Sequence, residues 1–305
     1  MADLANEFSW SKSRHEKFQE CRRAYFYQYY GSWGGWEAPP GSSERELYVL
    51  KKLSSRWQWA GSVVHEALRL MLSRARATGD FVSLEELLRR TRGRARAQWA
   101  GSREKSYWRE ASRITGLVEH EYAEPVPGEE WKRIWDEVIE GSVRSFYGSE
   151  TFAHLKRVPA SRWLTVDELD SWLLDGTKIW VAIDFAYRDE QGRLHVLDWK
   201  TGRERGLDHV QVAIYALYAR EKWGVPEDGV LGELVYLGNG GEQVTVQADA
   251  AALQGCREEM RRSIEAMRAA LEDPVRNLAR IDRFPQLQGR DACRRCPFRR
   301  PCGRI

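Results

Sequence analysis

The hydrophobic pattern of this chain changes after Pro159, and that change limits the folds open to it. Before Pro159, apolar residues recur mainly at helical spacing. After it, apolar and polar residues alternate in three segments rich in Trp, Val, Ile and Leu, namely 162–170, 178–188 and 193–200. The turn-forming runs Asp175-Gly176 and Glu190-Gln191-Gly192 separate these segments. The pattern predicts a three-stranded meander inside a largely helical chain.

Helices and two further strands surround this meander. Helices are predicted from about 11 to 30, near Glu44, from Gly61 past Leu72, and over much of 83–147. After the meander we expect a helix at about 207–222, strands at about 230–237 and 242–247, and a helix at about 249–272. This order predicts an α/β fold, with a mixed central β-sheet flanked by helices, an N-terminal and inserted helical subdomain, and a Cys-rich C-terminal tail.

Composition and charge exclude several other classes of protein. The 305 residues, 42% hydrophobic and 30% charged, suit one large or two ordinary globular domains and exclude a disordered or collagen-like polymer. A net charge of +3, from 48 basic and 45 acidic residues, excludes a highly charged histone-like protein. No apolar run approaches the roughly 18 residues of a membrane-spanning helix, and the first residues lack the apolar stretch of a signal sequence. We therefore expect a cytoplasmic protein with no membrane partner.

Two acids of the meander are candidates for chemistry. A hairpin centred on Gln191 sets Asp184 opposite Asp198, with their Cβ atoms about 5 Å apart on one face. Two carboxylates at that distance repel each other unless a cation lies between them, and a divalent metal ion is the simplest such cation. Lys200 shares this face, two residues beyond Asp198. The alternative is a surface hairpin with a charge ladder, but both acids follow apolar runs that are typical of buried strands.

These residues are part of a longer pattern. Asp184, Asp198-Trp199-Lys200-Thr201-Gly202, Gln211-Val212-Ala213-Ile214-Tyr215 and the upstream Gly61-Ser62-Val63-Val64-His65 occur in the chain. Together they resemble the RecB-type branch of the PD-(D/E)XK nuclease superfamily, whose motifs are Gly-x3-His, an acid, acid-x-Lys and Gln-x3-Tyr. The resemblance implies a restriction-endonuclease-like core. It covers about 9–75 and 160–305 and leaves roughly 76–159 unassigned.

The resemblance also implies roles for these residues. His65, Asp184, Asp198 and the main-chain carbonyl of Trp199 would bind Mg2+ or Mn2+, and Lys200 would orient the attacking water and offset charge on the phosphoryl oxygens. Gln211 and Tyr215 would position the site or contact the DNA backbone. A further acid at the start of the first strand would be Asp167 or Glu168, and we favour Glu168. Without the other motifs, His65 would be read as a core histidine, since it shares a helix flank with Leu68 and Leu72.

The cysteines extend the match. Three of the five crowd the end of the chain, and without a signal peptide such a cluster indicates a metal rather than disulfides. Cys21, Cys293, Cys296 and Cys302 resemble the iron-sulfur ligands of AddB-type nuclease domains and of CRISPR-associated adaptation nucleases. A 4Fe-4S cluster is therefore implied, although a four-thiolate zinc site would use the same ligands. Cys256 lies outside this pattern. The first cysteine is followed by Arg22 rather than the family's Pro.

The expected function is hydrolysis of DNA phosphodiester bonds by a metal-dependent, single-strand-preferring nuclease in DNA repair, CRISPR adaptation or anti-phage and anti-plasmid defence. The alternative is a catalytically inactive nucleic-acid-binding subunit of a larger DNA-processing complex. No phosphate-loop motif occurs, so the protein would act alone or with a separate helicase, CRISPR or defence protein as its partner. The aromatic residues between Tyr25 and Trp36 suit either stacking on bases or core packing.

The resemblance also divides the chain. The expected parts are an N-terminal helix and aromatic loop with the first cluster cysteine (1–60), a helical subdomain (61–159), the nuclease core (160–272) and the iron-sulfur tail (273–305).

Overall fold

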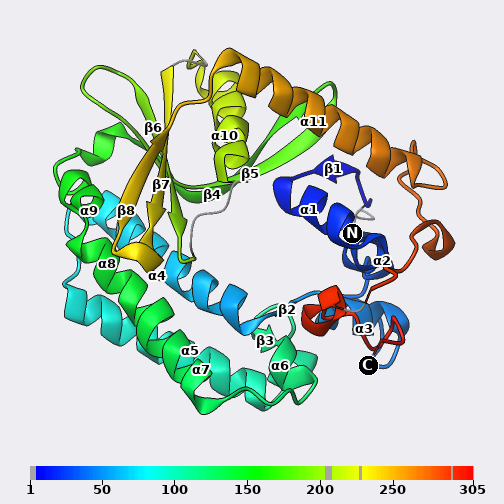
Figure 1. Cartoon of the computed structure of the whole chain (residues 1–305). Helices are drawn as coiled ribbons and strands as arrows, with labels where there is room; N and C mark the ends of the chain where they lie inside the picture. The colour runs from blue at the N-terminus through cyan, green and yellow to red at the C-terminus, as the bar shows by residue number, and fades with distance from the viewer. Residues whose placement is uncertain (1–4, 203–207, 227–228, 290, 305) are drawn as a thin grey trace.

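The computed structural model describes residues 5–202, 208–226, 229–289 and 291–304 (Figure 1). These residues form a mixed sheet of six strands, with the path β1-β5-β6-β7-β8 and β4 beside β5. The β1–β5 and β6–β7 pairs are parallel, and the β4–β5, β5–β6 and β7–β8 pairs are antiparallel. The strands are β1 (Ser9–Trp10), β4 (Trp163–Leu174), β5 (Thr177–Arg188), β6 (Leu194–Lys200), β7 (Val230–Tyr236) and β8 (Glu242–Val246). The α/β class, the mixed sheet and the meander β4–β5–β6 are thus confirmed.

Strand β5 shares one of its edges between two neighbours. Along one edge it pairs with β4 between Thr177 and Tyr187. Along the other edge it pairs with β6 through Phe185–Arg188 and with β1 through Lys178–Ile179. The two neighbours therefore leave a fork beside residues 180–184. Strand β1 was not predicted, because two residues are too short to show alternation.

Helices cover both faces of the sheet near this fork. On one face, α10 (Asp208–Trp223) and α11 (Ala250–Ala269) pack with β1 and α1 (Lys12–Glu20) into a large apolar core. On the other face lie α4 (Arg56–Thr78), α5 (Leu84–Arg103), α8 (Ser142–Gly148) and α9 (Glu150–Leu155). Strand β5 accordingly alternates between buried and less buried residues up to Ala182 and is buried without interruption from Ile183 to Tyr187. The predicted helix at 207–222 is confirmed from Asp208; residue 207 lies outside the described residues.

The predicted helix over 11–30 is wrong in one respect, because the helix is interrupted at Cys21. There the backbone is extended, with φ −161° and ψ 113°, between α1 and α2 (Arg22–Phe26), and a π-helical turn follows over Tyr27–Gly31. The Cys21 thiol accepts the backbone N–H of Ala24 at 3.5 Å and so caps α2. Helical spacing of the aromatic residues continues through the break, which is why the sequence pattern did not show it.

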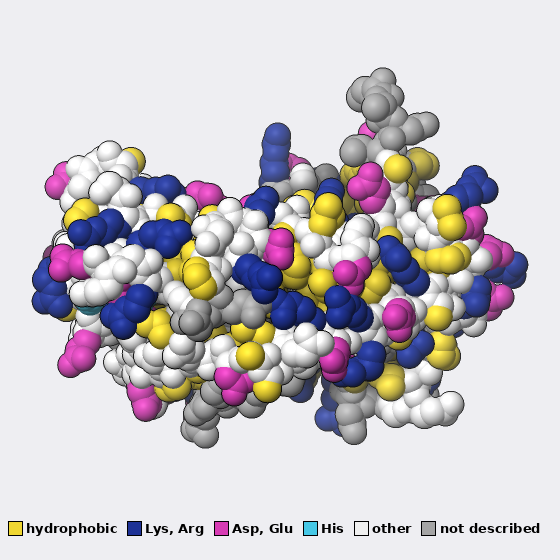
Figure 2. All heavy atoms as spheres, turned by 90° about the horizontal axis from the view of Figure 1, so that it is seen from above, with side chains coloured by type: hydrophobic (Ala, Val, Ile, Leu, Met, Phe, Trp, Pro, Cys, Tyr) yellow, Lys and Arg dark blue, Asp and Glu magenta, His cyan; other side chains and the backbone are white. Residues whose placement is uncertain are grey.

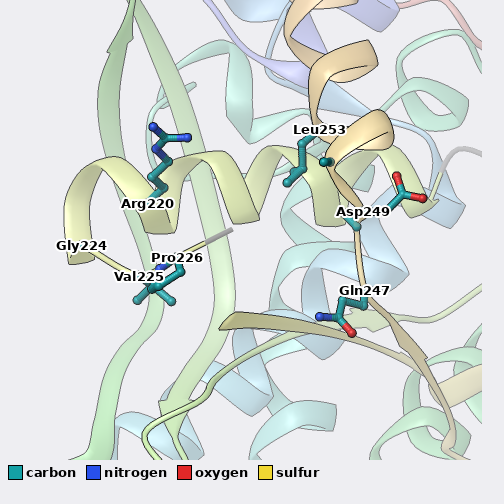
Figure 3. A pocket seen from close by; sticks show the side chains of 9 residues that line it. Arg220, Gly224, Val225, Pro226, Gln247, Asp249 and Leu253 are labelled. Atoms are coloured by element: carbon teal, nitrogen blue, oxygen red, sulfur yellow. The ribbon is translucent and has the colours of Figure 1, made fainter. Parts of the chain in front are cut away.

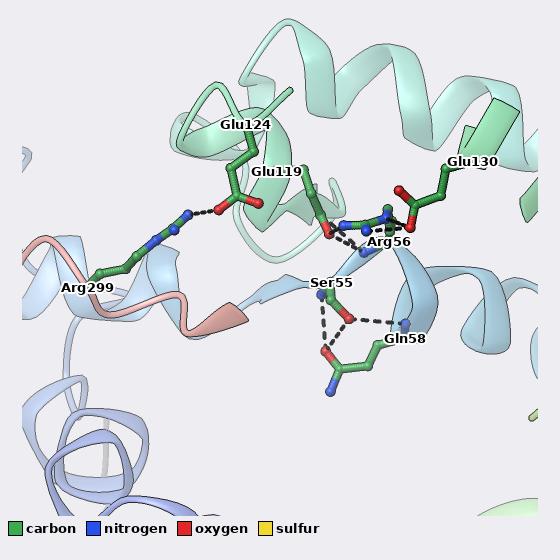
Figure 4. Close-up of polar contacts among 7 residues, drawn as sticks. All are labelled: Ser55, Arg56, Gln58, Glu119, Glu124, Glu130 and Arg299. Atoms are coloured by element: carbon green, nitrogen blue, oxygen red, sulfur yellow. Dashed lines mark hydrogen bonds and ion pairs between the residues drawn. The ribbon is translucent and has the colours of Figure 1, made fainter. Parts of the chain in front are cut away.

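Helix α4 starts at Arg56, five residues before the predicted Gly61, because polar residues fix its first turn. Ser55 and Gln58 form a capping box, and Arg56 pairs with Glu119 at 2.8 Å and Glu130 at 2.6 Å (Figure 4). These contacts tie α4 to the part of the chain for which the sequence suggested no role. That part also contains the short strand β3 (Gly116–Leu117), paired with β2 (Leu53–Ser54), and the helices α6 (Val118–Glu121) and α7 (Gly128–Arg133).

Both ends of the described chain meet. Arg23 Nε donates to the carbonyl of Phe284 at 2.7 Å, and the Tyr27 hydroxyl donates to that of Pro301 at 3.1 Å. Arg299 pairs with Glu124 (Figure 4), and Tyr122 donates to the carbonyl of Pro297 at 2.6 Å. Figure 1 shows the N-terminal helices α1 and α2, α3 (Ser43–Leu50) and the C-terminal segment side by side. The division into the four parts 1–60, 61–159, 160–272 and 273–305 stays a prediction.

The surface carries both signs of charge. The face in Figure 2 intersperses basic, acidic and hydrophobic side chains, in agreement with the net charge of +3. Among the described residues, no helix combines the length and apolar character needed to cross a bilayer.

Candidate active site

The two predicted acids lie at the fork in the sheet. Phe185 pairs with Leu197 and Ala186 with Val196, which confirms the register of a hairpin centred on Gln191 and sets Asp184 opposite Asp198 just beyond the last ladder pair. Both residues are buried, at 9% and 3% exposure. Asp184 Oδ2 accepts the backbone N–H of Trp199 at 2.8 Å. This hydrogen bond replaces a strand pairing and fixes the carboxylate.

The second acid is held from the α10 side. Asp198 Oδ1 accepts hydrogen bonds from Gln211 Nε2 at 2.8 Å and from the Tyr215 hydroxyl at 3.0 Å. The Tyr215 hydroxyl also lies 3.0 Å from the carbonyl oxygen of Ala182, a residue that pairs with β4 but, in the described ladders, with neither β1 nor β6. Gln211 and Tyr215 share a helix face because they are four residues apart. The predicted Gln-x3-Tyr pair is thus brought to Asp198.

Lys200 completes this group. Its Nζ lies 2.5 Å from Asp198 Oδ2 and donates to Gln211 Oε1 at 2.9 Å. The same Gln211 oxygen accepts from Lys12 Nζ at 3.1 Å, so a lysine of α1 reaches the site from the face of the sheet that α10 covers. Sequence reasoning did not assign Lys12, although it lies within the Ser11-Lys12-Ser13-Arg14 run that begins α1.

His65 comes from α4, on the opposite face of the sheet. Its Nδ1 lies 3.0 Å from Asp184 Oδ1, and its side chain is one-third exposed. Burial acts to lower the pKa of His65, but the neighbouring Asp184 carboxylate outweighs it and raises that pKa to about 9. His65 is therefore not a core histidine. The close approach of Gly61 to Thr201, 3.1 Å from where a Cβ would stand, lets α4 pass near the end of β6.

The third acid differs from the prediction. Glu168 points away from the site: its side chain is 62% exposed and pairs with Arg76 at 3.3 Å. Asp167 lies between the pairs Val166–Phe185 and Glu168–Ile183, opposite Asp184, in a left-handed conformation with φ 48°. Burial, followed by the charge of Asp184, raises the pKa of Asp167. The structure therefore brings Asp167, not Glu168, toward His65 and Asp184.

The electrostatics of this group favour a cation. Burial, and next the charge of Asp184, raise the pKa of Asp198 above its usual range. Asp198 Oδ2 is buried and receives no well-directed hydrogen bond, and its contact is the ion pair with Lys200. Hard carboxylate oxygens and an imidazole are donors that suit Mg2+ or Mn2+. As they stand, no three His, Cys, Asp or Glu side chains of the described ranges converge closely enough to ligate a metal ion.

Two cavities open beside the acids. One, of about 770 Å³, is lined by His65, Gly61, Asp167 and Thr201 among others. The second, of about 730 Å³, borders Gln211 and Tyr215. A third cavity, of about 830 Å³ between α10 and α11 (Figure 3), is lined by Arg220, Pro226, Asp249 and Leu253 but by none of the predicted site residues. The candidate site is therefore the pair of openings at the fork.

The four predicted cluster cysteines also share one location. Cys21, Cys293, Cys296 and Cys302 line a single small cavity between the N-terminal helices and the C-terminal segment. Burial raises the pKa of Cys296 to about 11, and burial and then the proximity of Cys21 raise that of Cys302. A nearby metal would reverse these shifts, because it binds the thiolate form. Cys256, by contrast, is buried in α11 within the core.

Comparison with known proteins identifies a family. The family model described as PD-(D/E)XK nuclease superfamily matches residues 9–303, which include the fork, both acids, Lys200 and the four cysteines. A search of curated proteins finds no match. The matched span covers almost the whole chain, so this chain belongs to the PD-(D/E)XK nuclease superfamily.

Proposed function

We propose that this protein is a metal-dependent deoxyribonuclease of the RecB-type branch, and that it hydrolyses phosphodiester bonds in single-stranded DNA or at single-stranded ends. The observation that carries the proposal is the pair of buried carboxylates, Asp184 and Asp198, at a fork in the sheet with Lys200 beside them. His65, Asp184, Asp198 and the Trp199 carbonyl would hold Mg2+ or Mn2+. Such an ion polarises a phosphoryl oxygen and makes water a stronger nucleophile at neutral pH.

The chain's own residues prepare this site. The Trp199 N–H donates to one oxygen of Asp184, while Gln211 and Tyr215 donate to Oδ1 of Asp198, and these hydrogen bonds hold the carboxylates at the fork. Lys200 supplies a positive charge beside them, and it would stabilise the extra negative charge that develops on the phosphoryl oxygens. Asp167 would add a third carboxylate on the His65 side; Glu168 is not part of the proposal.

The test is cleavage of a labelled single-stranded oligonucleotide with and without Mg2+ or Mn2+. We expect Lys200→Ala and Asp198→Ala to abolish cleavage, whereas Glu168→Gln, the matched control with an exposed carboxylate, should cleave like the wild type. Unchanged cleavage by both site variants would remove the assignment. A folded wild type that binds DNA but never cleaves it, with either metal, would instead identify a catalytically inactive binding subunit.

We also propose that Cys21, Cys293, Cys296 and Cys302 bind a 4Fe-4S cluster. The proposal is supported by their common cavity and by the resemblance of their spacing to that of AddB-type domains and CRISPR-associated adaptation nucleases. Protein purified without oxygen should be brown, with a broad absorption band near 400 nm that Cys21→Ser and Cys302→Ser remove. Cys256→Ser is the matched control and should keep the band. A colourless protein that contains one zinc ion per chain would overturn the iron-sulfur assignment.

The biological setting follows only from the resemblance. We propose a role in DNA repair, CRISPR adaptation or defence against phages and plasmids, with any helicase supplied by a separate chain. Affinity purification from the native host, with the Asp198→Ala variant as bait to hold uncleaved DNA, would identify such a partner.

A further inference from the structure

The cavity of about 730 Å³ continues from the active site toward the N-terminal segment. Gln211, Tyr215 and Ala182, which belong to or contact the group around Asp198, form one of its sides. Residues of the first turn of α1, together with Tyr29 and Trp33, form a second side. The third side is the β4–β5 hairpin, represented by Leu169 and Trp180.

The hairpin side is apolar and uncovered. Leu169 opposes Ala182 in the ladder and Ser171 opposes Trp180, so the four side chains share one face. Leu169 is 67% exposed, and Trp180 is half-buried. Across the cavity Trp33 is 37% exposed. Aromatic and aliphatic surface left uncovered beside a catalytic group indicates a ligand with flat apolar faces.

The same cavity has cations at two levels. Lys12 Nζ bonds to Gln211 next to the acids, and Lys178 Nζ lies 5.4 Å from the centre of the Trp180 ring. Their ion pairs, with Glu16 at 3.5 Å and Glu7 at 3.7 Å, involve glutamates that are at least half exposed. Such exposed pairs contribute little, so a phosphate group could replace either glutamate at small cost.

We propose that this cavity is the binding subsite for unpaired nucleotides of the DNA strand being cut, with bases stacked on Trp180 and Trp33 and phosphates near Lys12 and Lys178. The inference rests on the proposed nuclease function and adds the feature that selects the substrate. Stacking on aromatic rings needs bases free of their complementary strand. The volume matches pockets that hold one drug-sized ligand, which corresponds to about one or two nucleotides and is too small for a duplex.

The test is the binding of a short fluorescent oligothymidylate, measured by fluorescence anisotropy in the presence of EDTA so that no cleavage occurs. We expect Trp180→Ala and Trp33→Ala each to weaken binding about 5- to 150-fold, the loss typical for removal of one stacking ring. Leu173→Ala is the matched control for Leu169→Ala: both leucines lie on the same face of β4 and are about two-thirds exposed, but only Leu169 lines the cavity. Only variants whose melting temperature lies within 2 °C of the wild-type value are compared, because a shift of this size corresponds to less than about 1 kcal/mol of the free energy of unfolding.

Three results would overturn the subsite. These are wild-type affinity in both tryptophan variants, an equal loss of affinity for a blunt duplex, and a loss in Leu173→Ala as large as in Leu169→Ala. A stronger effect of Trp180→Ala on an oligouridylate than on the oligothymidylate would overturn its assignment to DNA. Cleavage by the wild type and its loss in Asp198→Ala, measured on the same preparations, decide the nuclease function independently.

Discussion

A single methyl group on β7 should disturb the active site through α10. The ideal Cβ of an alanine at position 232 would lie 2.3 Å from Cγ1, 2.7 Å from Cγ2 and 3.0 Å from Cβ of Val212. Carbon atoms in favourable contact are about 3.5–4.0 Å apart, so the overlap exceeds 1 Å. Val212 is 2% exposed, and its β-branched side chain has few other rotamers. Gly232→Ala must therefore move α10 or β7.

We expect this variant to lose about 3 kcal/mol of the free energy of unfolding, the upper end of the range for overpacked cores. Val212→Ala alone should cost about 2 kcal/mol, from two lost methyl groups of about 0.8 kcal/mol each and a small cavity. In the double variant the new methyl group occupies the space that Val212 gave up, so the loss should stay near 2 kcal/mol rather than reach about 5. Because Gln211 precedes Val212, cleavage should fall in Gly232→Ala and recover in part in the double variant.

Unfolding in urea is monitored by circular dichroism, and activity is measured with the oligonucleotide cleavage assay. Gly255→Ala in α11 is the matched control, since no atom lies within 4 Å of the ideal Cβ at this position. In an exposed helix position alanine is more stable than glycine by up to about 1 kcal/mol, so this variant should not lose stability. A Gly232→Ala protein as stable as the wild type, or a double variant as unstable as the sum of the single ones, would refute the reasoning.

Two further predictions concern charges away from the site. Arg300→Met should lower the free energy of unfolding, measured by chemical denaturation, by about 2 kcal/mol, because it removes the cation that pairs with Glu121, whose side chain is 2% exposed. Arg280→Met, whose acidic partners are exposed, should change the same free energy by less than about 1 kcal/mol. Equal effects of the two variants would contradict this difference between a buried and an exposed ion pair. His195→Gln should destabilise the protein more at pH 6 than at pH 9. Burial opposes the charged form, but Glu233 at 2.5 Å raises the pKa of His195, so the stability from its protonated form is complete below the unfolded pKa of about 6.5 and is lost as pH rises through the folded value. Melting temperatures of the wild type and of His195→Gln between pH 6 and pH 9 would check this prediction. A difference between the two melting temperatures that grows toward pH 9 would disprove it.

Local patterns predicted the parts of this protein that depend on local rules. The hairpin register followed from the turn at Gln191 and from alternation, so the opposition of Asp184 and Asp198 could be derived from the amino-acid sequence alone. The placement of Gln211 and Tyr215 followed from helical spacing.

The predictions that were wrong involve backbone conformations that cannot be predicted from residue type. Helical periodicity runs through Cys21 although the chain is extended there, and the left-handed φ of Asp167 turns its side chain, instead of that of Glu168, toward the site. Long-range contacts were equally invisible: nothing near Lys12 indicates that its ammonium reaches Gln211, 199 residues later.

The meeting of the two ends has a consequence for how the chain acquires its structure during translation. Trp10 donates to Ser263 Oγ, and Tyr27 donates to the carbonyl of Pro301, contacts that span 253 and 274 residues. At about 5–20 residues per second, the ribosome needs roughly 15 to 50 seconds to supply those partners. Until then Phe18 and Tyr25, which end up 1% and 0% exposed, have no cover from the C-terminal part of the core. The N-terminal segment should therefore be the last to become protected in the nascent protein, and the segment on which a chaperone would act.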